Sequence, residues 1–474
     1  MPEKFDAIII GSGPNGLAAG IELARNGLEV LIIEANDEIG GGTMSGELTL
    51  PGFTHDYCSA VHPLAACSPY FQSLPLEEFG LKWMYPKYSV AHPLMGEPAV
   101  FQTQSLQDTS EHLGRDKKAW SKLFKPFIEN GDTLLKDVLG PLKWPDGPID
   151  FLKFGLSALR PATSLVKSKF EEGRTRALFA GSAAHSVMPL DFYFSSAIGL
   201  VLLGAGHIKT WPVPKYGANS ISKSLTGYFQ GLGGKIETGN RIKNFKELPS
   251  ANAYVFDTDP HQLAAIAGSE LPEGFRRKLL KFNMGPGIFK VDWALDGPIP
   301  WTDPECNMAS TVHVGGTYEE IAESVRLMWN GKHSERPFLI VCQQSEIDPS
   351  RAPKGKHTGY AYCHVPHGSQ KDMTNIIESQ IERFAPGFKD IILERKSTSP
   401  QQLQAMNPNL IGGAITGGAS NLGQLFARPT LRMDPYSTPN DKIFICSAST
   451  PPGGGVHGMC GYWAARSVLK RLGG

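Results

Sequence analysis

The feature that most constrains the fold is a glycine-rich turn, near the beginning of the chain, between an apolar run and a helical pattern. Phe5 to Ile10 is the apolar run, Gly11 to Gly16 has the spacing G-x-G-x-x-G, and Leu17 to Asn26 has helical periodicity. A second apolar run, 29–33, ends in Glu34. Strand, glycine turn, helix, strand and acid in this order are typical of a Rossmann unit that binds a dinucleotide.

The glycines of the turn have separate physical roles. Gly11 allows the tight turn, Gly13 lets the backbone approach a pyrophosphate, and Gly16 lets the helix pack closely on the strand. The start of the helix offers N–H groups and a partial positive charge to phosphates, and Glu34 can accept hydrogen bonds from ribose hydroxyls. The predicted contacts are Gly11, Gly13, Pro14, Asn15, Gly16 and Glu34.

Charge and length exclude some classes of protein. The chain has 474 residues, enough for two or three domains, and its 46 Lys and Arg balance its 46 Asp and Glu. Because there is no basic excess, we expect no nucleic-acid partner. The seven cysteines form no C-x-x-C pair, and no His, Cys and Asp spacing indicates a metal site. An odd number of scattered cysteines favours a reducing compartment.

The beginning of the sequence and its hydropathy predict a cytoplasmic location. The first strand is expected after about four residues, which leaves no room for a signal peptide. The longest apolar stretch, Ala197 to Ala205, is too short to span a bilayer.

The rest of the chain alternates helical and strand patterns. Residues 69–145 read as helices and turns, with Lys117 to Leu139 the clearest helix, and 150–206 as apolar helices broken by Pro161 and Pro189. The run Gly287 to Leu295 alternates as a long strand. Its expected partners are 311–314, 338–343 and 360–364. An amphipathic helix is expected at 371–385, a late strand at 443–446, a glycine-proline loop at 449–455 and a helix at 459–472.

These patterns predict an α/β fold in which a Rossmann-like nucleotide domain is discontinuous. The nucleotide domain is expected to consist of residues 1–70, 215–265 and 435–474. Residues 71–214 and 266–434 are expected to form a substrate domain with a mixed β-sheet and a helical cap.

The number of fingerprints indicates which dinucleotide binds. A disulfide reductase driven by a pyridine nucleotide would carry a second fingerprint and a redox cysteine pair, whereas Gly231 to Gly234 follows a helix and does not qualify. A single fingerprint combined with a glycine-rich strand, loop and helix near residue 450 is typical of FAD proteins. No Cys or His stands in a context that demands a covalent link, so we expect non-covalent FAD.

The motifs at both ends resemble those of the phytoene desaturase family, in the flavoprotein group that includes the amine oxidases. The resemblance is carried by Ile8 to Leu17, Glu34, Gly40 to Gly42 and Cys446 to Gly458, and it runs from end to end through 285–293 and 360–366. It is strongest to the phytoene-dehydrogenase-like branch that contains pyridine nucleotide-disulfide oxidoreductase domain-containing protein 2. The resemblance implies a Rossmann-like FAD-binding domain of amine oxidase or phytoene desaturase type.

One position departs from that family. Its members commonly carry an arginine just after the second glycine pair, but residues 35–50 contain no Arg or Lys. We expect the backbone amides of Gly40 to Thr43 to contact the phosphate instead. Gly41, Gly42 and Thr43 are therefore predicted contacts of the cofactor.

The loop after residue 446 is the second predicted flavin contact. Gly453 to Gly455 would let the backbone run against the flavin, and amides at the start of the last helix would stabilise negative charge on reduction. The predicted contacts are Ser449, Gly454, Gly455, Val456 and His457. The alternative is a plain glycine turn followed by a packed helix.

Two residues are candidates for a catalytic role. His457 would lie at the ring edge and move a proton, or it is a capping or packing histidine. The resemblance to amine oxidases suggests that Lys290 lies near the flavin, although it could equally be a surface lysine at a sheet edge. His55, Asp56, Tyr57 and His62 would line the substrate entrance or satisfy buried backbone groups, and His185 reads as a core histidine.

The resemblance implies an FAD-dependent oxidoreductase that takes a hydride from an apolar, carotenoid-like substrate. A flavin supplies the redox chemistry, and the protein supplies orientation and exclusion of water. A saturase or isomerase remains an alternative, as does an amine oxidase, for which Tyr462 and Trp463 would supply an aromatic pair. A further alternative is a non-catalytic interaction protein stabilised by FAD.

The apolar helices of 150–206 suggest where such a substrate enters. They would cap an apolar tunnel and dock reversibly on a membrane surface, or they simply pack on the sheet of the substrate domain. If these helices dock on a membrane, their basic side chains would contact anionic lipid headgroups and their apolar side chains would enter the membrane interface. The basic set is Lys153, Arg160, Lys167 and Lys169, and the apolar set is Phe151, Leu152, Phe154 and Leu156.

Overall fold

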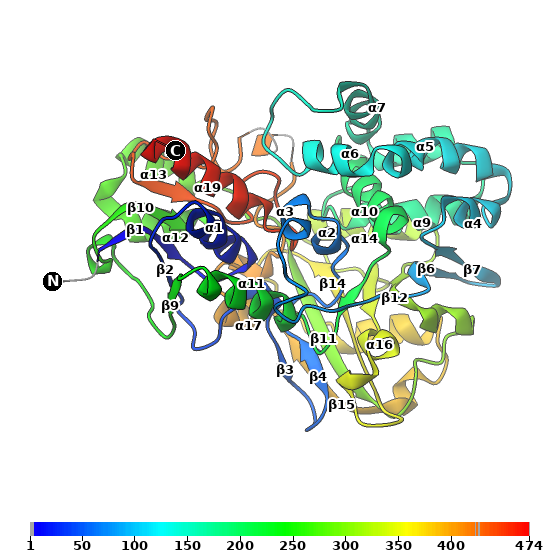
Figure 1. Cartoon of the computed structure of the whole chain (residues 1–474). Helices are drawn as coiled ribbons and strands as arrows, with labels where there is room; N and C mark the ends of the chain where they lie inside the picture. The colour runs from blue at the N-terminus through cyan, green and yellow to red at the C-terminus, as the bar shows by residue number, and fades with distance from the viewer. Residues whose placement is uncertain (1–3, 422, 425–426, 474) are drawn as a thin grey trace.

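The computed structural model describes residues 4–421, 423–424 and 427–473 and contains two large β-sheets (Figure 1). One sheet is entirely parallel and carries the glycine fingerprint at the end of its first strand. The other is mixed and lies beside it, with a group of helices packed above it in the view of Figure 1.

The parallel sheet has the strand order β16-β10-β1-β2-β9. Its strands are β1 (Phe5–Ile10), β2 (Val30–Ile33), β9 (Lys235–Glu237), β10 (Ala251–Phe256) and β16 (Ile443–Ile445). Side chains on one face pack against α1 (Pro14–Arg25), α11 (Asn219–Gly231) and α19 (Met459–Leu472), and those on the other pack against α12 (Pro260–Ala267) and α13 (Glu273–Leu280). Strands β1, β2, β10 and β16 are largely apolar because both of their faces are covered, whereas β9 at the edge of the sheet exposes Lys235 and Glu237.

The mixed sheet has seven strands in the order β15-β11-β14-β13-β12-β6-β7. They are β6 (Tyr88–Leu94), β7 (Glu97–Gln102), β11 (Gly287–Leu295), β12 (Ala309–Val314), β13 (Leu339–Cys342), β14 (His357–Val365) and β15 (Ile392–Thr398). All neighbours are antiparallel except β6 and β12. The predicted strand Gly287 to Leu295 and its three partners are confirmed.

Helices cover both faces of the mixed sheet. On one face lie α5 (Lys117–Glu129), α9 (Gly173–Ala184), α10 (Ser195–Lys209) and α14 (Tyr318–Trp329), and on the other lies α16 (Thr374–Glu382). The remaining helices are α2 (Pro63–Ala66), α3 (Pro69–Gln72), α4 (Leu106–Glu111), α6 (Gly131–Val138), α7 (Pro148–Ala158), α8 (Ala162–Lys169), α15 (Gln344–Ile347) and α17 (Pro400–Met406). Two-stranded ribbons pair β3 (Ser45–Glu47) with β4 (Thr54–Asp56) and β5 (Trp83–Met84) with β8 (Val213–Pro214).

The prediction of helices and turns for all of 69–145 was wrong between residues 83 and 102. This segment forms β5, β6 and β7, and β6 is buried along most of its length. Pro93 within the run and polar Ser89 and His92 hide the apolar alternation, although β6 pairs with strands on both sides. The helical stretch Lys117 to Leu139 is divided at Asn130 into α5 and α6.

The apolar segment 150–206 is helical, with breaks at both prolines, as predicted. Among the residues that the structure describes, no helix is both long enough and apolar enough to cross a membrane.

Candidate functional site

One continuous cavity of ≈530 Å³ connects the two sheets. At one end it is lined by the glycine fingerprint and by the ends of β1, β2 and β10, and at the other by β12, β13, β14 and the start of α10. The cavity therefore begins at the carboxyl ends of the parallel strands, where open α/β sheets bind their ligands.

The fingerprint is packed against a buried carboxylate that the sequence analysis did not single out. Asp257 follows β10, and its Oδ2 accepts a hydrogen bond of 2.9 Å from the Gly16 amide. A Cβ atom at Gly13 would lie 2.6 Å from the same oxygen, and one at Gly16 would lie 2.2 Å from the Gly11 carbonyl. Burial raises the pKa of Asp257 well above its usual range. The sequence did contain a signal for Asp257, because a carboxylate directly after an apolar strand is the same pattern that identified Glu34.

Glu34 lines the cavity at the end of β2, as the strand order requires. Its Oε2 accepts hydrogen bonds from the Ser12 amide (2.9 Å) and hydroxyl (2.6 Å), and its Oε1 accepts one from the Asn36 amide (2.9 Å). A carboxylate has about four acceptor sites, so these three bonds fix its orientation and leave capacity for a hydroxyl group.

The second glycine cluster and the late loop lie at the same cavity. Gly41 and Gly42 line it, and a Cβ atom at Gly42 would meet no atom within 4 Å. Thr43 is fully buried and donates its hydroxyl hydrogen to the Gly40 carbonyl, so its side chain supports the turn. From the late loop, the cavity is lined by Ser447, Ala448, Ser449 and 452–456.

Arg428 is an unpredicted cation beside this loop. Its Nη2 donates to the Thr416 and Ala448 carbonyls at 2.8 and 3.0 Å, and it lines the cavity. Burial lowers its pKa to about 10, which leaves it charged at neutral pH. Residues 35–50 lack the expected cation, and Arg428 brings one to the cavity from a distant part of the chain.

The donor and acceptor groups along the cavity fit a dinucleotide. At the end of the cavity near the fingerprint and the late loop, three buried polar atoms have no protein partner among the described residues: Asn15 Oδ1, Thr258 Oγ1 and Arg428 Nε. Unpaired buried polar atoms are costly unless a ligand or water satisfies them. Together with the open space at Gly42 and the acceptor capacity of Glu34, they match a ligand with phosphates and a ribose. Within residues 4–421, 423–424 and 427–473, no group of three or more His, Cys, Asp or Glu is arranged to hold a metal ion.

Neither candidate catalytic residue lines the cavity. His457 follows Val456, the last lining residue of the loop, and its Nδ1 accepts from the Met459 amide at 3.0 Å. Burial lowers the pKa of His457 to about 4, so the ring is neutral at pH 7. Lys290 is fully buried inside the sheet rather than at its edge, and its Nζ donates to Asp292 at 2.5 Å and to the Asp56 carbonyl at 3.0 Å. The alternative of a surface lysine at a sheet edge is wrong, because β11 lies between β14 and β15. A catalytic role for Lys290 stays a prediction.

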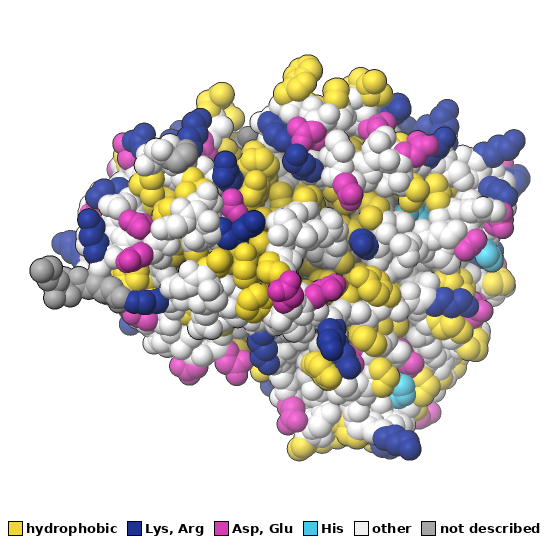
Figure 2. All heavy atoms as spheres, viewed as in Figure 1, with side chains coloured by type: hydrophobic (Ala, Val, Ile, Leu, Met, Phe, Trp, Pro, Cys, Tyr) yellow, Lys and Arg dark blue, Asp and Glu magenta, His cyan; other side chains and the backbone are white. Residues whose placement is uncertain are grey.

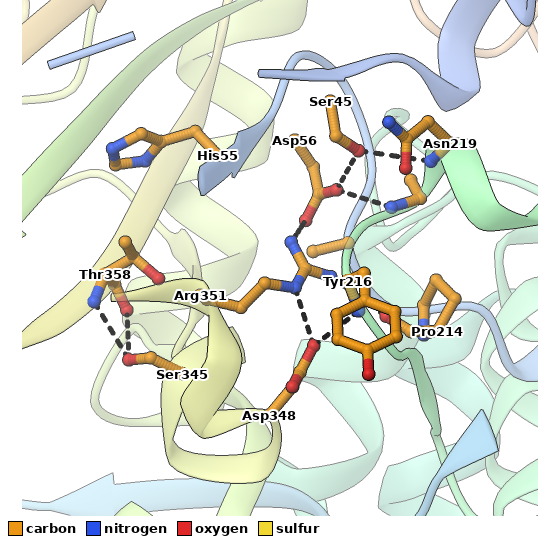
Figure 3. A network of polar contacts seen from close by, with 12 residues as sticks. Ser45, His55, Asp56, Pro214, Tyr216, Asn219, Ser345, Asp348, Arg351 and Thr358 are labelled. Atoms are coloured by element: carbon orange, nitrogen blue, oxygen red, sulfur yellow. Dashed lines mark hydrogen bonds and ion pairs between the residues drawn. The ribbon is translucent and has the colours of Figure 1, made fainter. Parts of the chain in front are cut away.

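The residues between His55 and His62 were predicted either to line the substrate entrance or to satisfy buried backbone groups, and the structure shows different environments for two of them. His62 lines the cavity, whereas Asp56 is part of a buried ionic network (Figure 3). Asp56 Oδ1 accepts from the Ser45 hydroxyl (2.6 Å) and the Ala218 amide (2.7 Å), and its Oδ2 accepts from Arg351 (2.9 Å). Burial raises the pKa of Asp56, but Arg351 and these hydrogen bonds outweigh it and the pKa falls below its usual value.

Arg351 is the centre of this network. Its Nε donates to Asp348 at 3.0 Å and its Nη2 to the Pro214 carbonyl at 3.1 Å, and its side chain is fully buried (Figure 3). Asp348 also accepts from the Tyr216 amide at 2.7 Å. The network thus joins β4, the segment after β8 and the segment after α15, which lie far apart in the sequence.

The far end of the cavity is an apolar chamber with polar groups at its wall. Most of its lining is apolar and comes from the strands of the mixed sheet, from α10 and from the segments on either side of α10: Val187, Phe194, Ala197, Ile198, Val201, Leu202, Trp211, Ile288 and Ile340. His62, His185, Tyr360, Tyr362 and His364 also line it. Tyr360, Tyr362 and His364 alternate along β14 and therefore share one face of the strand. The sequence analysis identified this run as a strand but did not predict that these side chains line a cavity.

The comparisons with known proteins agree with this architecture. A family profile described as "NAD(P)-binding Rossmann-like domain" matches residues 9–73. The rat protein named pyridine nucleotide-disulfide oxidoreductase domain-containing protein 2 is 25% identical, over 99% of this chain and 94% of that protein. The lycopene-forming phytoene desaturase of Pantoea ananas is 23% identical, over 97% and 98% respectively.

A solved structure shows the same fold. Wild-type putrescine oxidase bound to putrescine superimposes with a TM-score of 0.62 at 14% sequence identity, over 99% of both chains. These findings confirm the resemblance to the phytoene desaturase group, the predicted fold class, and an oxidoreductase of the FAD-dependent type.

Proposed function

We propose that this FAD-dependent oxidoreductase removes two hydrogens from a largely apolar substrate and leaves a carbon–carbon double bond. The observation that carries the proposal is the single cavity, which is continuous from the fingerprint to the apolar chamber. Non-covalent FAD, when bound along the fingerprint, supplies the hydride acceptor.

The residues of the chain bind, orient and exclude water. The fingerprint amides and Arg428 meet the negative charge of the dinucleotide, and Glu34 meets a ribose. The chamber walls remove apolar surface of the substrate from water at roughly 0.8 kcal/mol per methylene group. His457 and Lys290 lie behind the walls, so the protein supports the chemistry through binding rather than through a strong base at the cavity.

Anaerobic mixing of the FAD-loaded protein with apolar isoprenoids tests the proposal. The flavin absorbance is expected to bleach, and the product is expected to be lighter by two hydrogens. A saturase or isomerase would instead act only after prior reduction of the flavin. If no candidate hydrocarbon, alcohol or amine changes the redox state of the flavin, the proposed dehydrogenation is wrong.

One observation favours an amine oxidase as a second candidate. The rings of Tyr360 and Tyr362 both line the cavity, with centroids 6.5 Å apart and an interplanar angle of 24°. Tyr462 and Trp463, the pair suggested by sequence, instead pack against Tyr70 and the Leu139 carbonyl and do not line the cavity. Bleaching by primary amines, with release of ammonia, would favour this candidate.

NADPH is expected to reduce the flavin slowly or not at all. The sequence contains one fingerprint, and the parallel sheet that carries it has a single glycine turn of this kind. The measurement is flavin absorbance after anaerobic mixing with excess NADPH, and dithionite serves as the control that must bleach it at once. Rapid bleaching that saturates with NADPH would contradict the prediction.

The helical cap presents an apolar surface that we propose docks on a membrane (Figure 2). Trp144, Ile149, Leu152 and Leu156 are 85%, 70%, 62% and 62% exposed, at and before α7. The predicted apolar set needs a correction, since Phe151 and Phe154 turn inward and pack on the core. Lys153 pairs with Asp150 at 3.2 Å, which offsets its charge, so we expect docking to depend more on the apolar side chains than on anionic lipid.

Liposome flotation tests the docking. We expect the wild-type protein to float with liposomes and a Trp144→Ser, Leu152→Ser, Leu156→Ser variant to remain soluble, because the variant removes the side chains that would enter the interface. Replacement of the basic side chains Lys153, Arg160, Lys167 and Lys169 by Glu should reduce the floating fraction less than the three Ser substitutions do. Leu431→Ser, at another residue 80% exposed, is the control. A wild-type protein that stays in the soluble fraction would contradict the proposal.

A further inference from the structure

The chamber wall carries a cluster of histidines that the proposed function does not use. His185 and His364 line the chamber, and His313 lies directly behind His185. The Nε2 atoms of His185 and His313 are 2.9 Å apart, which requires one ring to donate and the other to accept. The rings of His313 and His364 both pack near Phe338, with centroids 5.5 and 6.3 Å away.

The hydrogen bonds of this cluster are incomplete. Both nitrogens of His364 are buried and have no partner among the described residues, and the same holds for His313 Nδ1. An unpaired N–H is the rarer defect in native structures, so His313 Nε2–H is the expected donor and its Nδ1 keeps a lone pair. His185 then carries its proton on Nδ1. A neutral His364 always has one donor and one acceptor nitrogen.

The surroundings of the cluster determine the charge of a matching ligand. Burial lowers the pKa of His185 to about 3 and of His364 to about 4, so both rings are neutral at pH 7. The acidic and basic residues that line the cavity are Glu34, Arg241, Asp257, Asp259 and Arg428, and they come from the fingerprint and loop segments rather than from the chamber strands or α10. Among the described residues, no charged side chain lines the chamber beside the histidines, so a carboxylate or ammonium group would lack a counter-ion there. Lys290 lies 4.2 Å from the ring centroid of Tyr360 but is already paired with Asp292.

We propose that the chamber selects an apolar molecule carrying one uncharged oxygen function, a hydroxyl or a ketone, which His364 and His185 bind at the chamber wall. This inference rests on the proposed function and specifies its substrate class. A pure hydrocarbon would leave the histidine nitrogens unpaired, and that costs more than the hydrogen bonds themselves gain. A hydroxyl can both donate and accept, as His364 requires, and a ketone can accept from His185 or His364.

Binding of matched cyclic terpenoids to the FAD-loaded protein tests the proposal. The probes are menthol, menthone, p-menthane and menthylamine, which have similar carbon skeletons, and binding is measured by calorimetry and by the shift of the flavin absorption band. We expect menthol or menthone to bind at least about tenfold more tightly than p-menthane and menthylamine. His364→Phe should reduce this preference at least about fivefold, and His364→Gln, which keeps a donor and an acceptor, should retain most of it. His112→Phe, at an exposed histidine, should change nothing.

Three outcomes would overturn the inference: equal binding of p-menthane, tighter binding of menthylamine, or no binding of any probe. If His364→Phe does not fold, His185→Phe and His364→Gln give the same comparison. Failure of the proposed function has a different signature, because the FAD-loaded protein would then keep its flavin oxidised with every substrate while still showing the calorimetric preference.

Discussion

Replacing Gly13 by valine is expected to leave the purified protein without flavin. The Cβ atom of the new side chain would lie 2.6 Å from Asp257 Oδ2, at the turn that must approach the pyrophosphate. Because Gly13 is expected to let the backbone approach the pyrophosphate, a larger side chain should clash with the cofactor, and the structure adds a clash with a buried carboxyl group. We expect FAD affinity to fall at least about a hundredfold, which corresponds to ~2.7 kcal/mol. The measurement is the ratio of flavin to protein absorbance after gel filtration.

Gly155→Val is the matched control for this variant. Gly155 lies in α7, where a Cβ atom would meet no atom within 4 Å, so the same substitution should leave the flavin content unchanged. A yellow, fully loaded Gly13→Val protein would contradict the assignment of the fingerprint to FAD.

Replacing Arg351 by methionine should lower the free energy of unfolding by about 3–5 kcal/mol. The substitution keeps much of the side-chain volume but leaves the carboxylates of Asp56 and Asp348 without their buried counter-ion. Leaving a buried carboxylate without its partner destabilises the folded state by far more free energy than an exposed ion pair contributes to it. The midpoint of urea unfolding should therefore fall markedly.

Arg326→Met provides the comparison. Arg326 is 53% exposed and forms ion pairs of 3.5 and 4.0 Å with Glu323 and Asp191. Its replacement should cost less than about 1 kcal/mol. If Arg351→Met is equally mild, the buried network does not stabilise the packing of β4 against the segments that follow β8 and α15.

The nucleotide-binding half was the more predictable part of the fold, because its signals are local. An apolar run, a glycine spacing and a terminal acid identify β1, α1 and β2 without knowledge of the remaining chain. The strand run 88–102 was missed because Pro93 and the buried polar side chains of β6 interrupt the alternation. Their environment is set by β12, more than two hundred residues away.

The lining of the cavity was predictable where glycine-rich backbone forms it and not where distant side chains converge. Gly41, Gly42, Ser449 and the 454–456 loop line the cavity, as the motifs indicated. Arg428, Asp257 and the histidine wall come from separate elements, and no spacing in the sequence relates them. The burial of Lys290 could not be predicted, because a strand pattern does not show whether the strand lies at the edge or in the centre of its sheet.

The order of segments in the parallel sheet has a consequence for biosynthesis. A ribosome makes β1, α1 and β2 first, yet β10 is added after residue 251 and β16 after residue 443, and α19 must then cover α1. Until then the fingerprint lacks Asp257, the late loop and the helix that shields its core. We therefore expect stable capture of the dinucleotide to be a late event in the maturation of the protein, after the last helix has been made.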